Sequence, residues 1–320
     1  MNGGIRKRKR LSSKGLFILL TTCIFLVALL PKAGASPCSI PSEGTKDITT
    51  GCTMAATIAV INTKQLVVSG NVATQPTITI PSKRLFDVES SGVLTLLGIT
   101  IKGGRTGASG SRDWPSYDDD GGQIRVQGSG TQLNLRDCYF DGEEISYRSN
   151  NGGSIIVADS ASINIERTTF ANFKAGCRGG AIVLMSLAVS TMSHVTFVGN
   201  YAKSPFSSSY TAYQSTNPIS STNRPIGSGG GALFVYDQAQ AYITDSTFER
   251  NVVQYSAGAI SVVNGQVNLT RCNFDCNSAS TPIAGSLINK DYPCEAHAQH
   301  FTAGNAGALG LFWDGTTGSV

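Results

Sequence analysis

An internal repeat built from two short signals constrains the fold of this chain more than any other feature of its sequence. The first signal is a Gly-Gly pair, or a looser version of it, followed by a small or polar residue and an aliphatic one. It recurs at residues 121–124, 152–155, 179–182, 230–233, 257–260 and 306–309. The second signal is a phenylalanine followed three residues later by an asparagine. It is complete at Phe197 and Asn200, at Phe248 and Asn251, and at Phe274 and Asn277.

The spacing of the phenylalanines gives the length of the repeat. The equivalent positions are Phe140, Phe170, Phe197, Phe248, Phe274 and Phe301, which are 30, 27, 51, 26 and 27 residues apart. The interval of 51 corresponds to one repeat of 27 residues and an insertion of 24. The inserted residues, approximately 204–227, are rich in Ser, Thr, Asn and Pro, so we expect them to leave the repeat as a surface loop.

Short runs of valine, isoleucine and leucine, separated by turn residues, occupy each repeat without helical periodicity. The repeat is too short for a propeller blade and lacks the helix of leucine-rich or ankyrin repeats. The sequence therefore predicts an all-β fold, a single-stranded right-handed parallel β-helix or solenoid, over residues 61–320. Residues 36–60 carry no repeat signal, and we expect them to form an N-terminal cap.

The repeated residues have predictable structural roles in a stack of coils. The phenylalanines are expected to form an aromatic column in the core. We expect the glycines, among them Gly180, Gly231 and Gly258, to supply bends with positive φ and to let coils approach closely. The asparagines are expected to adopt the left-handed conformation and to form a ladder of hydrogen bonds at a turn. Strand alternation places Cys138 and Cys272, each two residues before a phenylalanine, on the core side.

The cysteines suggest an oxidising compartment. Eight are present, of which Cys23 lies in the N-terminal segment, and proximity in the sequence predicts disulfides between Cys38 and Cys52 and between Cys272 and Cys276. Removal of the signal peptide would leave seven cysteines. Because this number is odd, at least one thiol is expected to stay free or to pair with another chain. Neither a Cys-x-x-Cys pair nor clustered histidine accompanies the cysteines, which argues against a zinc site.

Residues 1–35 have the three parts of a secretory signal peptide. A basic run at 6–10 precedes an apolar stretch at 15–30, and small residues at 33–35 form the expected cleavage site. The apolar stretch has 16 residues, fewer than the roughly 20 that span a bilayer comfortably. We therefore predict a secreted, extracellular or cell-surface protein without a stable membrane span after cleavage. The alternative is a chain that remains membrane-anchored through an uncleaved N-terminal segment.

Removal of the signal peptide changes the charge of the chain. The full chain has a formal charge of +4, but residues 1–35 hold seven of the 25 basic residues and none of the 21 acidic ones. The remaining basic residues are scattered and form no run. We therefore expect neither nucleic acid nor an anionic membrane surface as a partner.

The paired signals resemble the repeats of the chlamydial polymorphic outer membrane proteins and of related right-handed β-helix proteins of pectin-lyase-like fold. The residues that carry the resemblance are Gly-Gly-Ala-Ile at 179–182, Gly-Gly-Ala-Leu at 230–233, and the Phe-x-x-Asn signals that begin at Phe197, Phe248 and Phe274. The similarity covers roughly residues 120–310. It implies a domain displayed at the cell surface, where adhesion is the usual role of that family.

Two classes of function remain open on the sequence. A polysaccharide lyase or hydrolase of this fold would need paired carboxylates, or an Arg or Lys base beside acidic residues that hold calcium. Asp118, Asp119 and Asp120 form the nearest candidate for a calcium site, although three consecutive acids in a loop are usually only solvated. Apart from calcium there, no cofactor is implied. A metal cluster of His194, His297 and His300 is rejected because His194 lies several coils away.

The interpretation that we favour is a noncatalytic binding, adhesion or structural module whose partner is a carbohydrate or a protein at the cell surface or in the extracellular matrix. Arg136, Asp137, Arg167 and Arg271 hold similar repeat positions and are expected to form an outward charged column. Asn268 begins an N-glycosylation sequon, which matters only in a eukaryotic source. Because only 11 residues follow Leu309, we expect a partner or a further coil to cover the C-terminal edge.

Overall fold

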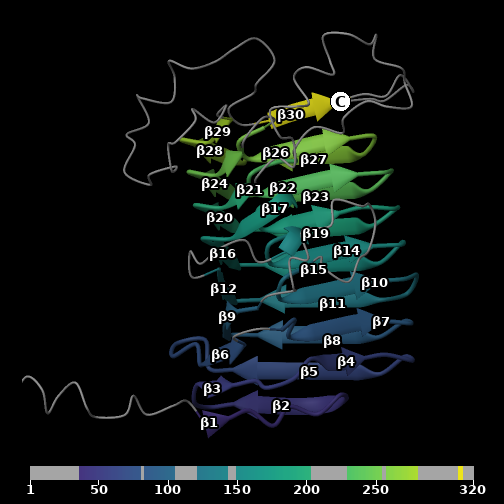
Figure 1. Ribbon diagram of the computed structural model, residues 1–320, viewed down its shortest axis with the longest axis vertical. Helices are drawn as coiled ribbons and strands as arrows, with labels where there is room; N and C mark the ends of the chain where they lie inside the picture. Colours follow the sequence, from purple (N-terminus) through teal and green to yellow (C-terminus); the bar gives the residue numbers. More distant parts are fainter. Residues whose placement is uncertain are drawn as a thin grey trace, which may run out of the picture. The chain divides into compact units, whose positions relative to one another are not determined.

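The computed structural model describes residues 36–80, 83–104, 121–142, 149–202, 229–253, 257–279 and 309–312. Within these ranges the regular structure is entirely β-strand, and the strands pair in parallel as successive coils of one stack (Figure 1). The predicted parallel β-helix is therefore confirmed. None of the described residues forms a helix with the length and hydrophobicity to cross a bilayer. The predicted signal peptide and most of the predicted insertion lie outside the described residues.

Two sheets form long walls of the stack. Sheet A contains β1 (Ser36–Pro37), β3 (Cys52–Thr53), β6 (Thr77–Ile80), β9 (Thr100–Gly103), β12 (Tyr139–Asp141), β16 (Thr169–Ala171), β20 (Thr196–Val198), β24 (Thr247–Glu249) and β28 (Asn273–Asp275). Sheet B contains β2 (Gly44–Ile48), β5 (Gln65–Gly70), β8 (Val93–Leu97), β11 (Gln132–Arg136), β15 (Ser162–Glu166), β19 (Val189–Ser193), β23 (Gln240–Thr244) and β27 (Gln266–Thr270).

A third wall and a shorter sheet complete each coil. Sheet C contains β4 (Ile58–Val60), β7 (Phe86–Glu89), β10 (Ile124–Gln127), β14 (Ile155–Ala158), β18 (Ile182–Leu184), β22 (Leu233–Tyr236), β26 (Ile260–Val263) and β30 (Leu309–Phe312). Sheet D contains β13 (Ser149–Asn151), β17 (Lys174–Arg178), β21 (Tyr201–Ala202), β25 (Val252–Val253) and β29 (Ser278–Ala279). The chain thus runs from sheet C to sheet B to sheet A, and from β13 onward through sheet D, before it returns to sheet C.

Strand alternation decides which side chains enter the core. In β11 the side chains of Leu133 and Leu135 point inward and are buried, whereas Gln132, Asn134 and Arg136 point outward. Register transmits this choice from coil to coil, since Leu133 pairs with Leu94 of β8 on one side and with Ile163 of β15 on the other. The core is therefore a set of aliphatic columns that run along the stack.

The predicted phenylalanine column is confirmed from Phe140 to Phe274, and its last predicted member, Phe301, lies outside the described residues. Phe140, Phe170, Phe197 and Phe248 are fully buried and, with Phe274, pair in register along sheet A. Successive ring centroids are 4.9, 5.3, 4.9 and 4.9 Å apart, and the rings are nearly parallel. Burial of each ring contributes about 1.5 to 3 kcal/mol, and stacking adds to this.

The asparagine ladder is present, but its backbone differs from the prediction. Asn251 Nδ2 donates hydrogen bonds to the Phe197 carbonyl (3.0 Å) and to Asn277 Oδ1 (2.9 Å), while Asn251 Oδ1 accepts from the backbone and side-chain nitrogens of Asn200 (3.1 and 2.9 Å). The left-handed conformation falls one residue earlier, at Gly199, Arg250 and Cys276, with φ of 64°, 51° and 52°. The asparagines therefore act through their amides, because they follow the bend instead of forming it.

The glycine pairs permit a close approach between coils, as predicted. The positive φ predicted for Gly180 and Gly231 is wrong, because the left-handed backbone falls on the preceding residue in one pair, at Gly179 (φ 54°), and on neither glycine of the pair at 230 and 231. A Cβ on Gly180 would lie 1.9 Å from the carbonyl oxygen of Gly231, and a Cβ on Gly231 would lie 2.2 Å from that of Gly258. Each of these glycines thus leaves room for the backbone of the next coil.

The N-terminal residues belong to the stack. Strands β2, β3 and β4, which lie within residues 36–60, pair in parallel with β5, β6 and β7. The predicted disulfide between Cys38 and Cys52 is present and ties the start of this coil to β3. At the other end β30 pairs with β26, as the glycine signal before Leu309 indicated. The predicted cover over this edge stays a prediction.

The predicted disulfide between Cys272 and Cys276 is wrong. Cys272 has a free thiol, and Cys276 is disulfide-bonded elsewhere. Cys272 comes two residues before Phe274 and packs against the core, whereas Cys276 follows β28 at a left-handed bend. The two cysteines thus lie at opposite ends of β28 in different surroundings, although they are close in the sequence. Cys138, at the equivalent position of an earlier coil, is buried as predicted.

Replacement of Asn251 by alanine is expected to destabilise the stack. The change leaves buried groups of Asn200 and the Phe197 carbonyl without their partner, which costs about 2 to 4 kcal/mol in the free energy of unfolding. Urea unfolding of the two proteins measures this difference. Asn268→Ala, at an exposed asparagine, is the matched control and should change stability by less than about 0.5 kcal/mol. Equal effects of the two substitutions would contradict a structural role for the ladder.

Candidate ligand-binding face

A column of polar side chains runs along the outer face of sheet B. Its members, which we call the polar column, come from the middle of successive strands and are Thr95, Asn134, Asn164, Thr191 and Tyr242. Asn134 Nδ2 donates to Thr95 Oγ1 (3.3 Å), Asn164 Nδ2 donates to Asn134 Oδ1 (3.0 Å), and Thr191 Oγ1 donates to Asn164 Oδ1 (2.6 Å). The hydrogen bonds fix the orientation of these amides and hydroxyls before any ligand arrives.

A shallow groove lies beside the polar column. Its volume is about 500 Å³, and it is open along much of its length. One side is formed by the polar column from Asn134 to Tyr242, and the other by the next outward residues of the same strands. These are Arg136, Glu166, Ser193 and Thr244. The groove thus follows the axis of the stack and crosses several coils.

Tyr242 gives the polar column an aromatic surface. Its side chain is 39% exposed, and its hydroxyl donates to Gln240 Oε1 (2.9 Å) on the same strand. On the next strand, β27, the paired residue is Asn268, the predicted glycosylation site, which is exposed. An exposed ring beside fixed amides and hydroxyls suits a ligand with an apolar face and many hydroxyl groups.

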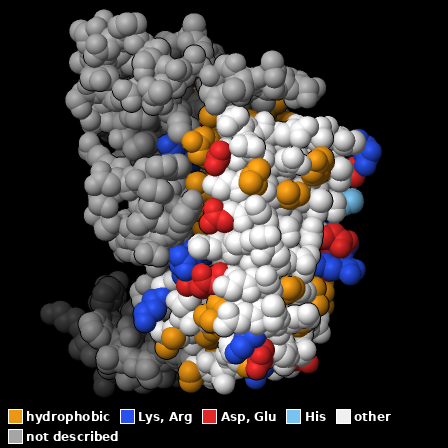
Figure 2. Space-filling view, turned by 90° about the vertical axis from the view of Figure 1, so that its right-hand side faces the viewer, with side chains coloured by type: hydrophobic (Ala, Val, Ile, Leu, Met, Phe, Trp, Pro, Cys, Tyr) orange, Lys and Arg blue, Asp and Glu red, His pale blue; other side chains and the backbone are white. Residues whose placement is uncertain are grey.

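The adjoining side of the stack has little charge. Figure 2 shows the side on which the turns from sheet C to sheet B lie, where uncharged groups predominate and acidic and basic side chains gather toward the borders. Exposed apolar side chains on and beside these turns include Leu187 (52%) and Val189 (38%). This surface favours contacts with uncharged groups over ionic ones.

A separate column of acidic and basic residues, with one histidine among them, lies at the corner where sheet B ends. Asp137, Arg167, His194, Asp245 and Arg271 follow successive strands, and each has a left-handed backbone with φ between 44° and 55°. Arg167 donates to both carboxylate oxygens of Asp137 (2.6 and 3.0 Å), and Arg271 donates to both of Asp245 (2.6 and 2.7 Å). The predicted outward column of charge is therefore present, and Arg167 and Arg271 are each paired with a carboxylate of the preceding coil.

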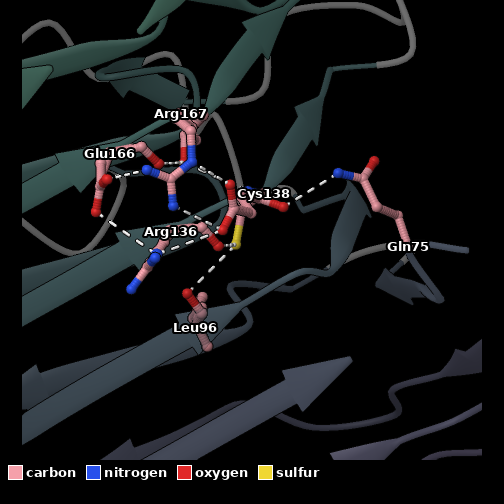
Figure 3. Close-up of polar contacts among 8 residues, drawn as sticks. Gln75, Leu96, Arg136, Cys138, Glu166 and Arg167 are labelled. Carbon is pink, nitrogen blue, oxygen red and sulfur yellow. Dashed lines mark hydrogen bonds and ion pairs between the residues drawn. The ribbon is translucent and has the colours of Figure 1, made fainter. Parts of the chain in front are cut away.

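Figure 3 shows the lower part of this corner. Arg167 also contacts Glu166, and Arg136 lies between the carboxylates of Asp137 and Glu166, at 3.4 and 3.6 Å. Beside Arg136 the Cys138 sulfur approaches the carbonyl oxygens of Leu96 (3.4 Å) and Arg136 (3.2 Å). Burial raises the pKa of the Cys138 thiol to about 11, so this thiol is a core group and not a nucleophile.

The ion pairs at this corner change the pKa values of their carboxyl and guanidinium groups. The hydrogen bond from Arg167 lowers the pKa of Asp137, and that from Arg271 lowers the pKa of Asp245. The same contacts raise the pKa of Arg167 and of Arg271. A catalytic acid needs a raised carboxyl pKa and an arginine base a lowered guanidinium pKa, and both shifts run the other way at this corner.

Several predicted site residues fall where the structure gives no account of them. The residues proposed to bind calcium, Asp118, Asp119 and Asp120, lie outside the described residues, as do His297 and His300. The chain returns from the acidic segment at Gly121, whose carbonyl accepts a hydrogen bond from Arg84 Nε (3.1 Å). Among the described residues no three His, Cys, Asp or Glu side chains come close enough to hold a metal ion.

The polar column was missed on the sequence, although a signal for it exists. Asn134, Asn164, Thr191, Tyr242 and Asn268 each stand six residues before a phenylalanine of the core column. The position is constant, but the residue type changes between amide, hydroxyl and phenol. A search for outward positions in phase with the phenylalanines would have found it.

The family of the chain follows from its sequence together with this architecture. Residues 122–292, more than half of the 320, match the model of the right-handed β-helix region family. The chain belongs to this family, and the predicted right-handed fold is confirmed. No curated protein and no solved structure matches the chain.

The pairing of Asp137 with Arg167 predicts a pH-dependent contribution to stability. Because the folded pKa of Asp137 lies below its unfolded value, the contribution is present above the unfolded pKa and is lost as the pH falls through the folded pKa. Asp137→Asn tolerates the left-handed backbone and removes the charge together with one of the two acceptors for Arg167, so it resembles the protonated carboxyl group. Denaturant unfolding is therefore expected to show a less stable variant at about pH 7 and no difference in strong acid.

The control for this measurement is Glu89→Gln, which removes a charge on the outer face of sheet C. At neutral pH this variant is expected to have nearly the same free energy of unfolding as the unmodified protein. A stability deficit of Asp137→Asn that persisted unchanged into strong acid would contradict the ionic origin of the effect.

Proposed function

We propose that this protein is a noncatalytic extracellular binding module that holds glycan chains along the outer face of sheet B. The observation that carries the proposal is the polar column with its groove and with Tyr242 exposed at one end. Coils repeat about every 4.8 Å, so the face offers fixed donors and acceptors at regular intervals. A polysaccharide likewise repeats its hydroxyls and its apolar ring faces, and is therefore a suitable ligand for such a face.

The borders of the groove suggest how the ligand is held. Asn134 and Asn164 provide amide donors and acceptors for hydroxyl groups, and Tyr242 provides a ring for stacking on a sugar. Arg136 and Glu166 lie on the opposite side with charges of both signs. The groove thus has no strong net charge, which favours a neutral glycan over a polyanion.

The cellular setting is part of the proposal and rests on the sequence. The signal-peptide pattern of residues 1–35 supports secretion or surface display. The resemblance of the repeats to the chlamydial polymorphic outer membrane proteins supports adhesion as the biological role. A protein partner on the same face, and a polysaccharide lyase or hydrolase, are the competing functions that the experiment must separate.

Binding to an array of neutral and acidic polysaccharides tests the proposal. A bound glycan is expected, and Tyr242→Ala is expected to weaken its binding about tenfold, because loss of a stacking contact costs about 1.4 kcal/mol. Asn164→Ala is expected to weaken binding as well, since Asn134 and Thr191 lose their common partner. Titration calorimetry with the bound polysaccharide measures both changes.

Tyr139→Ala is the matched control, because Tyr139 is a half-buried tyrosine on the outer face of sheet A and is expected to leave affinity unchanged. An assay for reducing ends and unsaturated products runs in parallel. Release of product that is abolished by substitution of Asp118, Asp119 and Asp120 would contradict the binding module and favour the polysaccharide-active enzyme. An equal loss of glycan affinity in Tyr242→Ala and Tyr139→Ala would contradict the placement of the site on sheet B.

A further inference from the structure

The outer face of sheet C changes its chemistry along the stack. On β7 and β10 the outward residues are polar and partly exposed, namely Asp87, Glu89, Arg125 and Gln127. From β14 onward the outward residues in the same register are mostly apolar. We call six of these the apolar face: Ile156, Ala158, Val183, Met185, Phe234 and Val263.

The side chains of the apolar face are buried although they point away from the core. Each is at most 8% exposed, and together they form a cluster separate from the main core. Outward side chains on sheet B show what an uncovered wall looks like, since Val189 and Tyr242 are 38% and 39% exposed. Burial on the outside of a single-layered wall requires a second layer of chain over it.

We propose that residues 203–228, the insertion between β21 and β22, are this second layer and dock on the apolar face. The insertion leaves the stack at Ala202 and returns at Gly229, beside the middle of the apolar face. A Cβ on Gly229 would lie 2.4 and 2.5 Å from ring atoms of Phe234, so the returning chain passes flat against this ring. The Arg178 guanidinium lies 5.6 Å from the centroid of the same ring.

The insertion has fewer charged residues than residues 105–120 or residues 280–308, so its composition suits contact with an apolar surface better. Residues 203–228 contain Phe206, Tyr210, Tyr213, Ile219 and Ile226, and their charged side chains are Lys203 and Arg224 alone. Residues 105–120 hold six charged side chains, and residues 280–308 hold two acids, a lysine and two histidines. A segment of 26 residues also has ample reach to cross the four coils of the apolar face.

Docking changes the role assigned to this segment. On the sequence it was expected to be a surface loop, whereas as a second layer it seals sheet C from solvent and leaves sheet B open. The inference rests on a different face from the proposed glycan site, so the outcome for glycan binding does not bear on it.

Photo-cross-linking of the folded, full-length protein identifies the occupant. Photo-methionine replaces methionine with little change of shape, and Met185 belongs to the apolar face, whereas Met192 and Met54 are buried in the main core. Mass spectrometry is expected to find Met185 joined to residues 203–228, and Met192 and Met54 joined only to neighbouring core strands. Cross-links from Met185 to residues 280–308, or to a second copy of the chain, would overturn the proposal.

A shortened variant provides the second measurement. Register aligns Ala202 with Val253 and Leu233 with Ile260, so the three residues 254–256 make the same connection in the next coil. Replacement of residues 203–229 by this short connection is expected to raise the fluorescence of a hydrophobic dye several-fold while the β-sheet circular dichroism is retained. A folded shortened variant with unchanged dye fluorescence would also overturn the proposal. If the variant does not fold, the cross-linking result decides.

Discussion

The parallel hydrogen bonds between coils are the constraint on which the rest of this structure depends. They hold equivalent residues of successive coils at a fixed separation, so a residue type that recurs in phase becomes a continuous column. The phenylalanines then stack, the asparagine amides meet, and glycine faces glycine where two backbones would otherwise collide. The same register also produces the outward columns, because inward and outward positions alternate along one strand.

This dependence explains which parts of the structure the sequence predicted. Phe197, Phe248 and Asn251 were found because identical residues recur, and identity is visible without an alignment. The polar column was missed because Asn164, Thr191 and Tyr242 share a position and a polar character but no residue type. An outward position needs only to tolerate solvent and its neighbours, so its sequence drifts while its geometry stays fixed.

The disulfide prediction failed for a related reason. Cys38 and Cys52 are 14 residues apart and form a disulfide, whereas Cys272 and Cys276 are four apart and do not bond to each other. Within a coil, sequence distance does not measure spatial distance, because Cys272 precedes β28 and packs against the core, whereas Cys276 follows β28 at a left-handed bend. Alternation relative to the core phenylalanines was the better guide, since it gave both Cys138 and Cys272 a place on the core side.

The two outer walls differ in a way that bears on function. Most outward residues of sheet C from β14 to β26 are apolar and buried, which agrees with the proposed second layer over this wall. The polar column on the outer face of sheet B is hydrogen-bonded from Thr95 to Thr191 and lines an open groove. At the corner beside the groove, the ion pair between Asp137 and Arg167 lowers the pKa of Asp137 and raises the pKa of Arg167, so these two groups are poorly suited to proton transfer. The proposed binding role rests on this difference, because the ordered amides of Asn134 and Asn164 and the exposed ring of Tyr242 lie on the wall whose outer face is open.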